Sequence, residues 1–173
     1  MAFSINFKNT TTAGSGLLQS SGCSVFNKEI HTEIEIKGTP EKVWSVLMEF
    51  EEFPNWNPMI RKARGEAVLG RKLEIFVQAE GARGMAFKPT VVKVDLNREF
   101  RWLGKVGIRG VFDGEHIFSI EPIDGDTVRF VHREQFGGLM TPLILPFIAN
   151  DTVRGFNDMN SALKSRVEQM KNK

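Results

Sequence analysis

The stretch ANDTVRGFNDMNSALKSRVEQM, residues 149–170, decides the fold of this chain. Its apolar side chains recur every three or four residues, at Ala149, Val153, Phe156, Met159, Leu163, Val167 and Met170. That spacing is the period of an α-helix with one apolar face. Polar and charged residues fill the opposite face. Because a long helix of this kind must lay its apolar face on another element, the residues before it must supply a surface.

The preceding residues predict β-strands joined by short turns. Residues 30–36 alternate apolar and polar side chains, which is typical of a half-buried strand. Six further strands are predicted, over residues 59–66, 71–80, 85–95, 99–104, 113–122 and 127–136. Turn residues separate them, and short turns make successive strands antiparallel neighbours. We therefore expect an α+β protein in which a seven-stranded antiparallel sheet meets one long helix.

Prolines mark where two helices begin. Thr39-Pro40-Glu41 predicts a helix that starts after the first strand, with Thr39 as the N-cap, and stops before Pro54. Near the C-terminal stripe, Thr141-Pro142 repeats the start signal, but Pro146 follows a few residues later. The long helix is thus expected either to begin with a kink at Pro146 or to start near Asn150. Gly155 is expected to be a second point where it can bend.

The composition excludes several classes of function. The chain has 173 residues, 41% of them hydrophobic, and a formal net charge of +2, with the basic residues scattered. These values suit one globular domain with a core and do not indicate binding to nucleic acid. No apolar run approaches the roughly 18 residues of a membrane span, so stable membrane insertion is not expected.

The first 26 residues differ from the rest. They are rich in Thr, Ser, Gly and Asn and lack the pattern of a secretory signal, so we expect a weakly ordered leader before a single domain over residues 27–172. Cys23 is the only cysteine, which excludes an internal disulfide and favours a reducing, cytoplasmic compartment. Neither a cofactor nor a metal is expected, because no compact ligand motif is present.

The element order and five local stretches resemble a known superfamily. The stretches are Thr39–Trp44, Phe53–Pro58, Phe112–His116, His132–Phe136 and Gly155–Asn160. Over residues 27–170 the chain is similar to the helix-grip (SRPBCC) superfamily of START lipid-transfer domains and polyketide cyclase/dehydrase-like proteins, and the stretches look like a bacterial branch of it. The resemblance implies a curved sheet wrapped around the C-terminal helix, one or two short helices after the first strand, and a cavity between sheet and helix.

Strand alternation sorts candidate ligand-binding residues onto the face that the resemblance turns toward this cavity. Those predicted to contact a ligand are Trp56, Ile75, Phe87, Trp102, His116, Phe118, His132, Glu134, Phe136, Phe147, Phe156 and Met159. Three of them, His116, His132 and Glu134, interrupt otherwise apolar faces. A buried carboxylate is costly, so Glu134 should have a partner or a raised pKa.

The three polar residues allow several interpretations. They can form a structural hydrogen-bonded group, orient a polar part of a ligand, or act in catalysis, for which His132 and Glu134 are the candidates. Two histidines and a carboxylate are also a plausible metal-ligand set, although the spacing is not that of a metal motif. His31 points the other way from Ile30 and Ile34 and is not expected to join them.

Three functions follow from these interpretations. The leading one is binding of a small apolar or amphipathic molecule, such as a lipid, isoprenoid or polyketide-like compound, without catalysis. The first alternative is a cyclase/dehydratase-type enzyme that uses His132 and Glu134, and the second is an interaction domain like the related activators of a chaperone ATPase. A monomer or weak homodimer is expected. The very apolar stretch 139–148 is expected to cover the core, to gate the cavity or to form a dimer contact.

Overall fold

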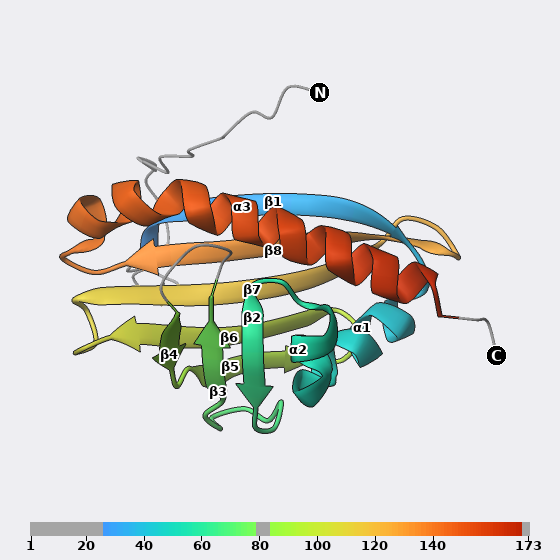
Figure 1. Cartoon of the computed structure of the whole chain (residues 1–173), viewed down its shortest axis with the longest axis horizontal. Coiled ribbons are helices and arrows are strands. Elements are labelled where there is room, and N and C mark those ends of the chain that lie inside the picture. The colour runs from blue at the N-terminus through green and yellow to red at the C-terminus, as the bar shows by residue number, and fades with distance from the viewer. Residues whose placement is uncertain (1–25, 79–83, 171–173) are drawn as a thin grey trace, which may run out of the picture.

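The long helix predicted from the apolar stripe is present as α3 (Thr141–Glu168), and it lies along a curved sheet (Figure 1). The computed structural model describes residues 26–78 and 84–170. Within these residues no helix combines the length and the apolar composition that crossing a bilayer requires. The predicted α+β class and the helix-grip arrangement are both confirmed.

The larger sheet has five strands in the order β1-β8-β7-β6-β5, and all its neighbours are antiparallel. Its strands are β1 (Phe26–Lys37), β5 (Thr90–Asp95), β6 (Glu99–Val106), β7 (Phe112–Pro122) and β8 (Thr127–Gly137). The strand that opens the described part of the chain therefore pairs with the strand that comes last, and α3 packs against both.

A smaller sheet contains β2 (Ile60–Arg64), β3 (Glu74–Val77) and β4 (Met85–Phe87), and its strands cross the long strands in the view of Figure 1. The prediction of seven strands in one sheet is wrong in this respect, because the described residues form eight strands in two sheets. The strand predicted over 85–95 is divided at Lys88 and Pro89. Pro89 has no backbone N–H to donate, and its carbonyl accepts a bond from Leu73 N at 2.9 Å.

The connection after β1 contains the predicted short helices, α1 (Pro40–Met48), η1 (Phe50–Glu52) and α2 (Phe53–Trp56). Pro40 occupies the start of α1, and Thr39 has the extended backbone of an N-cap residue, although its side chain makes no capping bond. Buried Asn57 ends this segment, because its Oδ1 accepts bonds from Met59 N at 2.9 Å and Ile60 N at 2.8 Å.

Helix α3 begins earlier than the stripe alone indicated. It starts at Thr141 and continues through Pro146, so a start near Asn150 is excluded. Because Pro146 has no N–H, the carbonyl of Pro142 one turn earlier has no donor within the helix. Both prolines are exposed, so water can bond to this carbonyl. Gly155 serves close packing, because a Cβ atom there would lie 2.9 Å from Met59 Sδ.

The core consists of two apolar clusters. The larger lies between α1, both sheets and the C-terminal half of α3, and includes Phe118, Phe130 and Leu163. The smaller lies under the first half of α3 and contains Ile30, Phe112, Phe136, Leu145 and Phe156. The two clusters meet at a set of buried polar side chains, described below.

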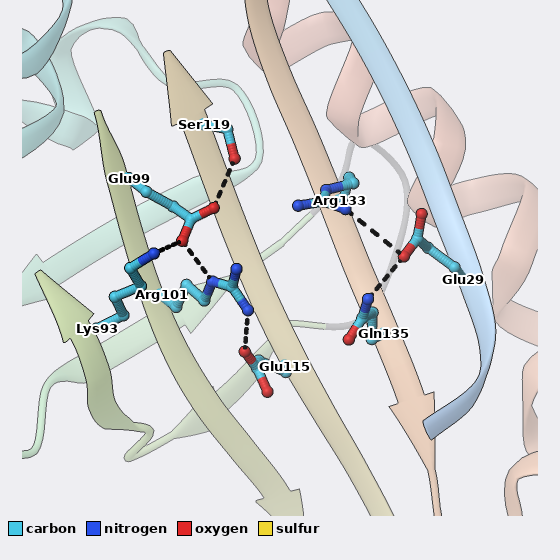
Figure 2. Close-up of polar contacts among 8 residues, drawn as sticks. All are labelled: Glu29, Lys93, Glu99, Arg101, Glu115, Ser119, Arg133 and Gln135. Atoms are coloured by element: carbon cyan, nitrogen blue, oxygen red, sulfur yellow. Dashed lines mark hydrogen bonds and ion pairs between the residues drawn. The ribbon is translucent and has the colours of Figure 1, made fainter. Parts of the chain in front are cut away.

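The outer face of the large sheet carries ion pairs in place of a covering element. In Figure 2, the Glu99 carboxylate bridges Lys93 at 2.5 Å and Arg101 at 2.8 Å, and Arg101 also reaches Glu115 at 3.0 Å. Burial alone would raise the pKa of Glu99, but the bonds from Arg101 and Lys93 outweigh it and lower the pKa to about 2. Glu99 therefore stays ionised in the folded protein.

Candidate functional site

Five polar side chains form a belt across the inner face of the sheet, between the two apolar clusters. We call Thr32, His116, His132, Glu134 and Asn160 the polar belt. Strand register places them side by side: β1 pairs Thr32 with His132, and β7 pairs His116 with Glu134. Asn160 reaches the belt from α3. All but Glu134 are at least 90% buried, so their polar groups must find partners within the protein.

Four of the five belt residues form one continuous chain of hydrogen bonds. His132 Nδ1 lies 2.9 Å from Asn160 Oδ1, and His132 Nε2 lies 2.6 Å from His116 Nε2. The Asn160 amide donates to Thr32 Oγ1 at 3.0 Å, and the Thr32 hydroxyl donates to the backbone carbonyl of His132 at 3.3 Å. Four side chains from β1, β7, β8 and α3 are thus joined through their polar atoms.

The chain of bonds assigns the protons on both rings. Since Asn160 Oδ1 can only accept, His132 must carry its proton on Nδ1, and its Nε2 is left as an acceptor. His116 must then donate from Nε2, which leaves its Nδ1 without a proton in the neutral ring.

Burial, together with the neighbouring ring of His132, holds the pKa of His116 well below 6.5. Burial lowers the pKa of His132 to about 3, against a smaller raising effect of Asn160. Both rings are therefore neutral at neutral pH.

Glu134 stands at the open end of this chain. Its Oε2 lies 3.9 Å from His116 Nδ1, the one ring nitrogen still free to accept a proton. Burial raises the pKa of Glu134 from 4.5 to about 7, so protonated and ionised forms coexist at neutral pH. The side chain nevertheless remains 21% exposed. It is the only member of the belt at the boundary between the core and solvent.

Gly114 makes room for this carboxyl group. A Cβ atom on Gly114 would lie 2.5 Å from Glu134 Oε1, so any larger residue would displace it. Gly104 is the direct partner of Gly114 on β6, and a Cβ there would lie 3.6 Å from the Phe87 ring and 3.7 Å from the Gly114 carbonyl oxygen. Two facing residues without side chains therefore lie beside Glu134 on the inner face of the sheet.

Aromatic rings enclose the histidine pair. The Phe156 ring of α3 stacks on His132 with centroids 3.7 Å apart and an interplanar angle of 11°. Trp102 and Phe118 lie against His116, with centroids 4.8 and 4.6 Å away. His132 is fully buried and both of its ring nitrogens have partners, so Glu134, with 21% of its side chain exposed, is the most exposed member of the belt.

The predicted site residues divide into three groups. Most are buried on the inner face or under α3 and line the two clusters: Ile75, Trp102, His116, Phe118, His132, Phe136, Phe156 and Met159. Trp56, Phe87 and Glu134 are half-buried, and Trp56 Nε1 is shielded without a hydrogen-bond partner among the described residues. The remaining predicted residue, Phe147, is 86% exposed, whereas the other eleven are buried or half-buried.

Two members of the belt were absent from the sequence prediction, although the pattern contains them. Thr32 occupies the inward position between Ile30 and Ile34. Asn160 lies four residues after Phe156 and three before Leu163, which is the buried face of the helix. A polar residue at a position that the period assigns to the core is the signal that identifies both.

The belt does not have the form of a metal site. The facing Nε2 atoms of His116 and His132 are 2.6 Å apart, a hydrogen-bond distance that is shorter than the roughly 3.3 Å between two nitrogens bonded to one tetrahedral ion at about 2.0–2.1 Å. Within residues 26–78 and 84–170 no group of three or more His, Cys, Asp and Glu side chains is arranged to hold a metal.

Comparison with solved structures finds the same fold in proteins of low sequence identity. A START superfamily protein from Mycobacterium smegmatis is 24% identical, with a TM-score of 0.62 over 83% of this chain and 99% of that one. The ZhuI aromatase/cyclase from Streptomyces sp. R1128 is 13% identical, with a TM-score of 0.68 over 82% and 93%. Truncated norcoclaurine synthase from Thalictrum flavum is 17% identical, with a TM-score of 0.65 over 83% and 95%.

Sequence comparison assigns the family. No curated protein matches the chain. A model of the family described as polyketide cyclase/dehydrase and lipid transport matches residues 28–168, which is most of the chain. The chain therefore belongs to the polyketide cyclase/dehydrase and lipid transport family.

Proposed function

We propose that the protein binds a small apolar or amphipathic molecule, of the lipid, isoprenoid or polyketide-like class, with Glu134 as its polar contact. The observation that carries this proposal is the position of the Glu134 carboxyl group, half-buried at the open end of a fully bonded polar chain. With a pKa of about 7 it can donate to a ligand carbonyl when protonated or accept from a ligand hydroxyl when ionised.

The surroundings of Glu134 support an apolar ligand. Phe136 follows it on β8, and Ile30 is its direct partner on β1. The facing glycines Gly104 and Gly114 add no side chains of their own beside it, and the Glu134 carboxyl group and the Phe87 ring lie over them. The half-buried Trp56 and Phe87 remain proposed wall residues. Sites of this kind bury most of an apolar ligand and orient it with a few polar groups.

The belt itself is a positioning device in this proposal. Both histidines are neutral, and each hydrogen bond from Thr32 to His116 has one fixed donor and one fixed acceptor. The unprotonated Nδ1 of His116 therefore always faces Glu134. That nitrogen lies 3.9 Å from Glu134 Oε2, which is beyond hydrogen-bond distance. His132 acts through His116 and does not touch the ligand.

Proton transfer at Glu134 is the second candidate function, favoured by the same pKa near 7. In a dehydration, the Glu134 carboxylate would take the proton from carbon next to a ligand carbonyl. The protonated carboxyl group would then return it to the departing hydroxyl, and water would leave. The ZhuI aromatase/cyclase, which has the same fold, has a name that is consistent with chemistry of this class.

Native mass spectrometry of freshly purified protein tests the binding proposal. We expect a co-purified small molecule on the wild type, much less of it on Glu134→Gln, and wild-type occupancy on the control Glu121→Gln, which changes an exposed carboxyl group on β7. Equal occupancy in all three proteins would contradict the role of Glu134. Loss of water from the bound molecule on incubation, absent in Glu134→Gln, would support the enzyme.

A further inference from the structure

The end of the molecule formed by residues 104–111 and 138–148, which we call the apolar end, exposes large hydrophobic side chains. At the start of α3, Leu139 is 84% exposed, Leu143 62% and Phe147 86%. Val106, the last residue of β6, is 49% exposed, and Ile108 in the turn that follows is 77% exposed. Isolated exposed apolar residues are ordinary, but a concentration of them marks a contact surface.

These two segments form one rigid surface. Leu139 N donates to the Gly110 carbonyl and Met140 N to the Val111 carbonyl, both at 2.9 Å. Gly138 permits this contact, since its φ is +109° and a Cβ there would lie 2.6 Å from the Val111 carbonyl oxygen. Figure 1 shows the β6–β7 turn and the start of α3 at the same end of the molecule.

The exposed residues of α3 belong to one stripe. Leu143 and Phe147 are four residues apart on successive turns, and Leu139 continues the line just before the helix. Their neighbours Ile144, Leu145 and Ile148 turn inward and pack with the smaller cluster. The first two turns of α3 are therefore apolar on the face that packs on the smaller cluster and also on the opposite, exposed face. Within the described residues nothing covers the exposed face.

The charges of the apolar end are all positive. Residues 138–148 contain no charged side chain, and residues 104–111 contain Lys105 and Arg109 but no acid. Both cations are exposed and form no ion pair within the described part of the chain. Elsewhere the chain mixes both signs, with 23 basic and 21 acidic residues in total. An occupant of this surface must accept apolar side chains and supply negative charge beside them.

Charge excludes two of the available occupants. A second copy packed symmetrically would bring the same cations toward each other, because a two-fold interface uses one surface twice. Residues 1–25, which join β1 beside Gly137, carry Lys8 and no acidic residue, so they supply no negative charge either. An anionic lipid surface provides both an apolar interior and acidic headgroups.

We propose that the apolar end binds to the surface of a membrane that contains anionic lipids, without crossing it. Leu139, Leu143, Phe147 and Ile108 would enter the boundary between headgroups and acyl chains, while Lys105 and Arg109 meet the headgroups. This inference goes beyond the proposed ligand site and does not depend on it, since every residue that carries it lies outside the polar belt.

Flotation of the full-length protein with lipid vesicles tests the proposal. We expect binding to vesicles of phosphatidylcholine mixed with phosphatidylglycerol, weaker binding to phosphatidylcholine alone, and release by salt. Replacing Leu143 and Phe147 by Asp should abolish binding. Replacing Lys105 and Arg109 by Gln should weaken it about fivefold per cation, since each is worth about 1 kcal/mol at such a surface.

Leu96→Asp is the matched control. Leu96 is 69% exposed in the turn between β5 and β6, at the opposite end of β6, and its replacement should leave vesicle binding unchanged. Circular dichroism verifies that each variant is folded. The proposal is overturned if the wild type stays with the soluble fraction, if Leu96→Asp loses binding equally, or if sedimentation shows that Leu143 and Phe147 hold two copies together while vesicles bind neither form.

Discussion

Replacing Glu134 by Gln should stabilise the protein at neutral pH. Between pH 4.5 and about 7 the Glu134 carboxyl group is protonated in the folded chain and ionised in the unfolded chain. The folded state then binds the extra proton, so its stability falls as the pH rises through this window. At about 1.4 kcal/mol per pH unit, the rise of the pKa from 4.5 to about 7 corresponds to about 3 kcal/mol.

Gln at this position removes the titration and keeps nearly the same side-chain shape beside His116. The variant should therefore match the wild type near pH 4.5 and exceed it by about 3 kcal/mol at pH 8. Because 21% of the Glu134 side chain is exposed and water screens its charge, about 3 kcal/mol is an upper limit for this stability difference. Titration of His116 and His132 occurs in both proteins and cancels in the difference.

Urea unfolding at several pH values measures this difference. With a slope of about 1–3 kcal/mol per molar urea, the midpoint of the variant should move up by about 1–3 M at pH 8. Glu121→Gln serves as the control and should show no such pH-dependent gain, because its carboxyl group is exposed. A stability difference for Glu134→Gln that stays constant from pH 4.5 to 8 would refute the assignment of Glu134 as a neutral, buried acid.

Three further substitutions examine other parts of the structure. Asn160→Ala leaves the His132 Nδ1–H donor buried without an acceptor and should lower the unfolding free energy by about 1–3 kcal/mol in urea titrations; no loss would contradict the bonded chain. Gly114→Ala should displace the Glu134 carboxyl group and lower its titration midpoint in NMR toward 4.5, and an unchanged midpoint would count against that contact. Glu99→Gln should cost about 1 kcal/mol at pH 7. Because its folded pKa is lowered, that deficit should vanish as the pH falls from 4.5 toward 2, and a deficit that persists at pH 2 would exclude the ion pairs as its cause.

The spacing of apolar residues in the sequence predicted which face of each helix and strand is buried. The stripe ending at Val167 is the inner face of α3, and Leu163 and Met159 are fully buried on it. Alternation likewise placed His116 and His132 on the inner face of the sheet. These predictions succeed because burial of apolar area is the largest favourable term in folding and repeats with the geometry of the element.

Features that depend on contacts distant in sequence were not predictable in this way. The strand predicted over 85–95 is divided between two sheets at Pro89, whose carbonyl accepts a bond from Leu73 N. Leu73 belongs to a different predicted strand, over 71–80, so the local pattern could not show this bond. The exposure of Phe147, by contrast, agrees with the helical period, because nine residues at about 100° each place it on the side of α3 opposite Phe156. The bond between Thr32 and Asn160 joins two positions that neither local period can relate.

The pairing of β1 with β8 sets the timing of folding during synthesis. Thr32 needs Asn160, which follows 128 residues later. At about 5–20 residues per second, a ribosome takes roughly 6 to 26 seconds to make the intervening chain. For most of that time β1 lacks its sheet neighbour β8, and the part of α3 that carries Asn160 is made only at the end. The polar belt is therefore complete only once α3 has emerged.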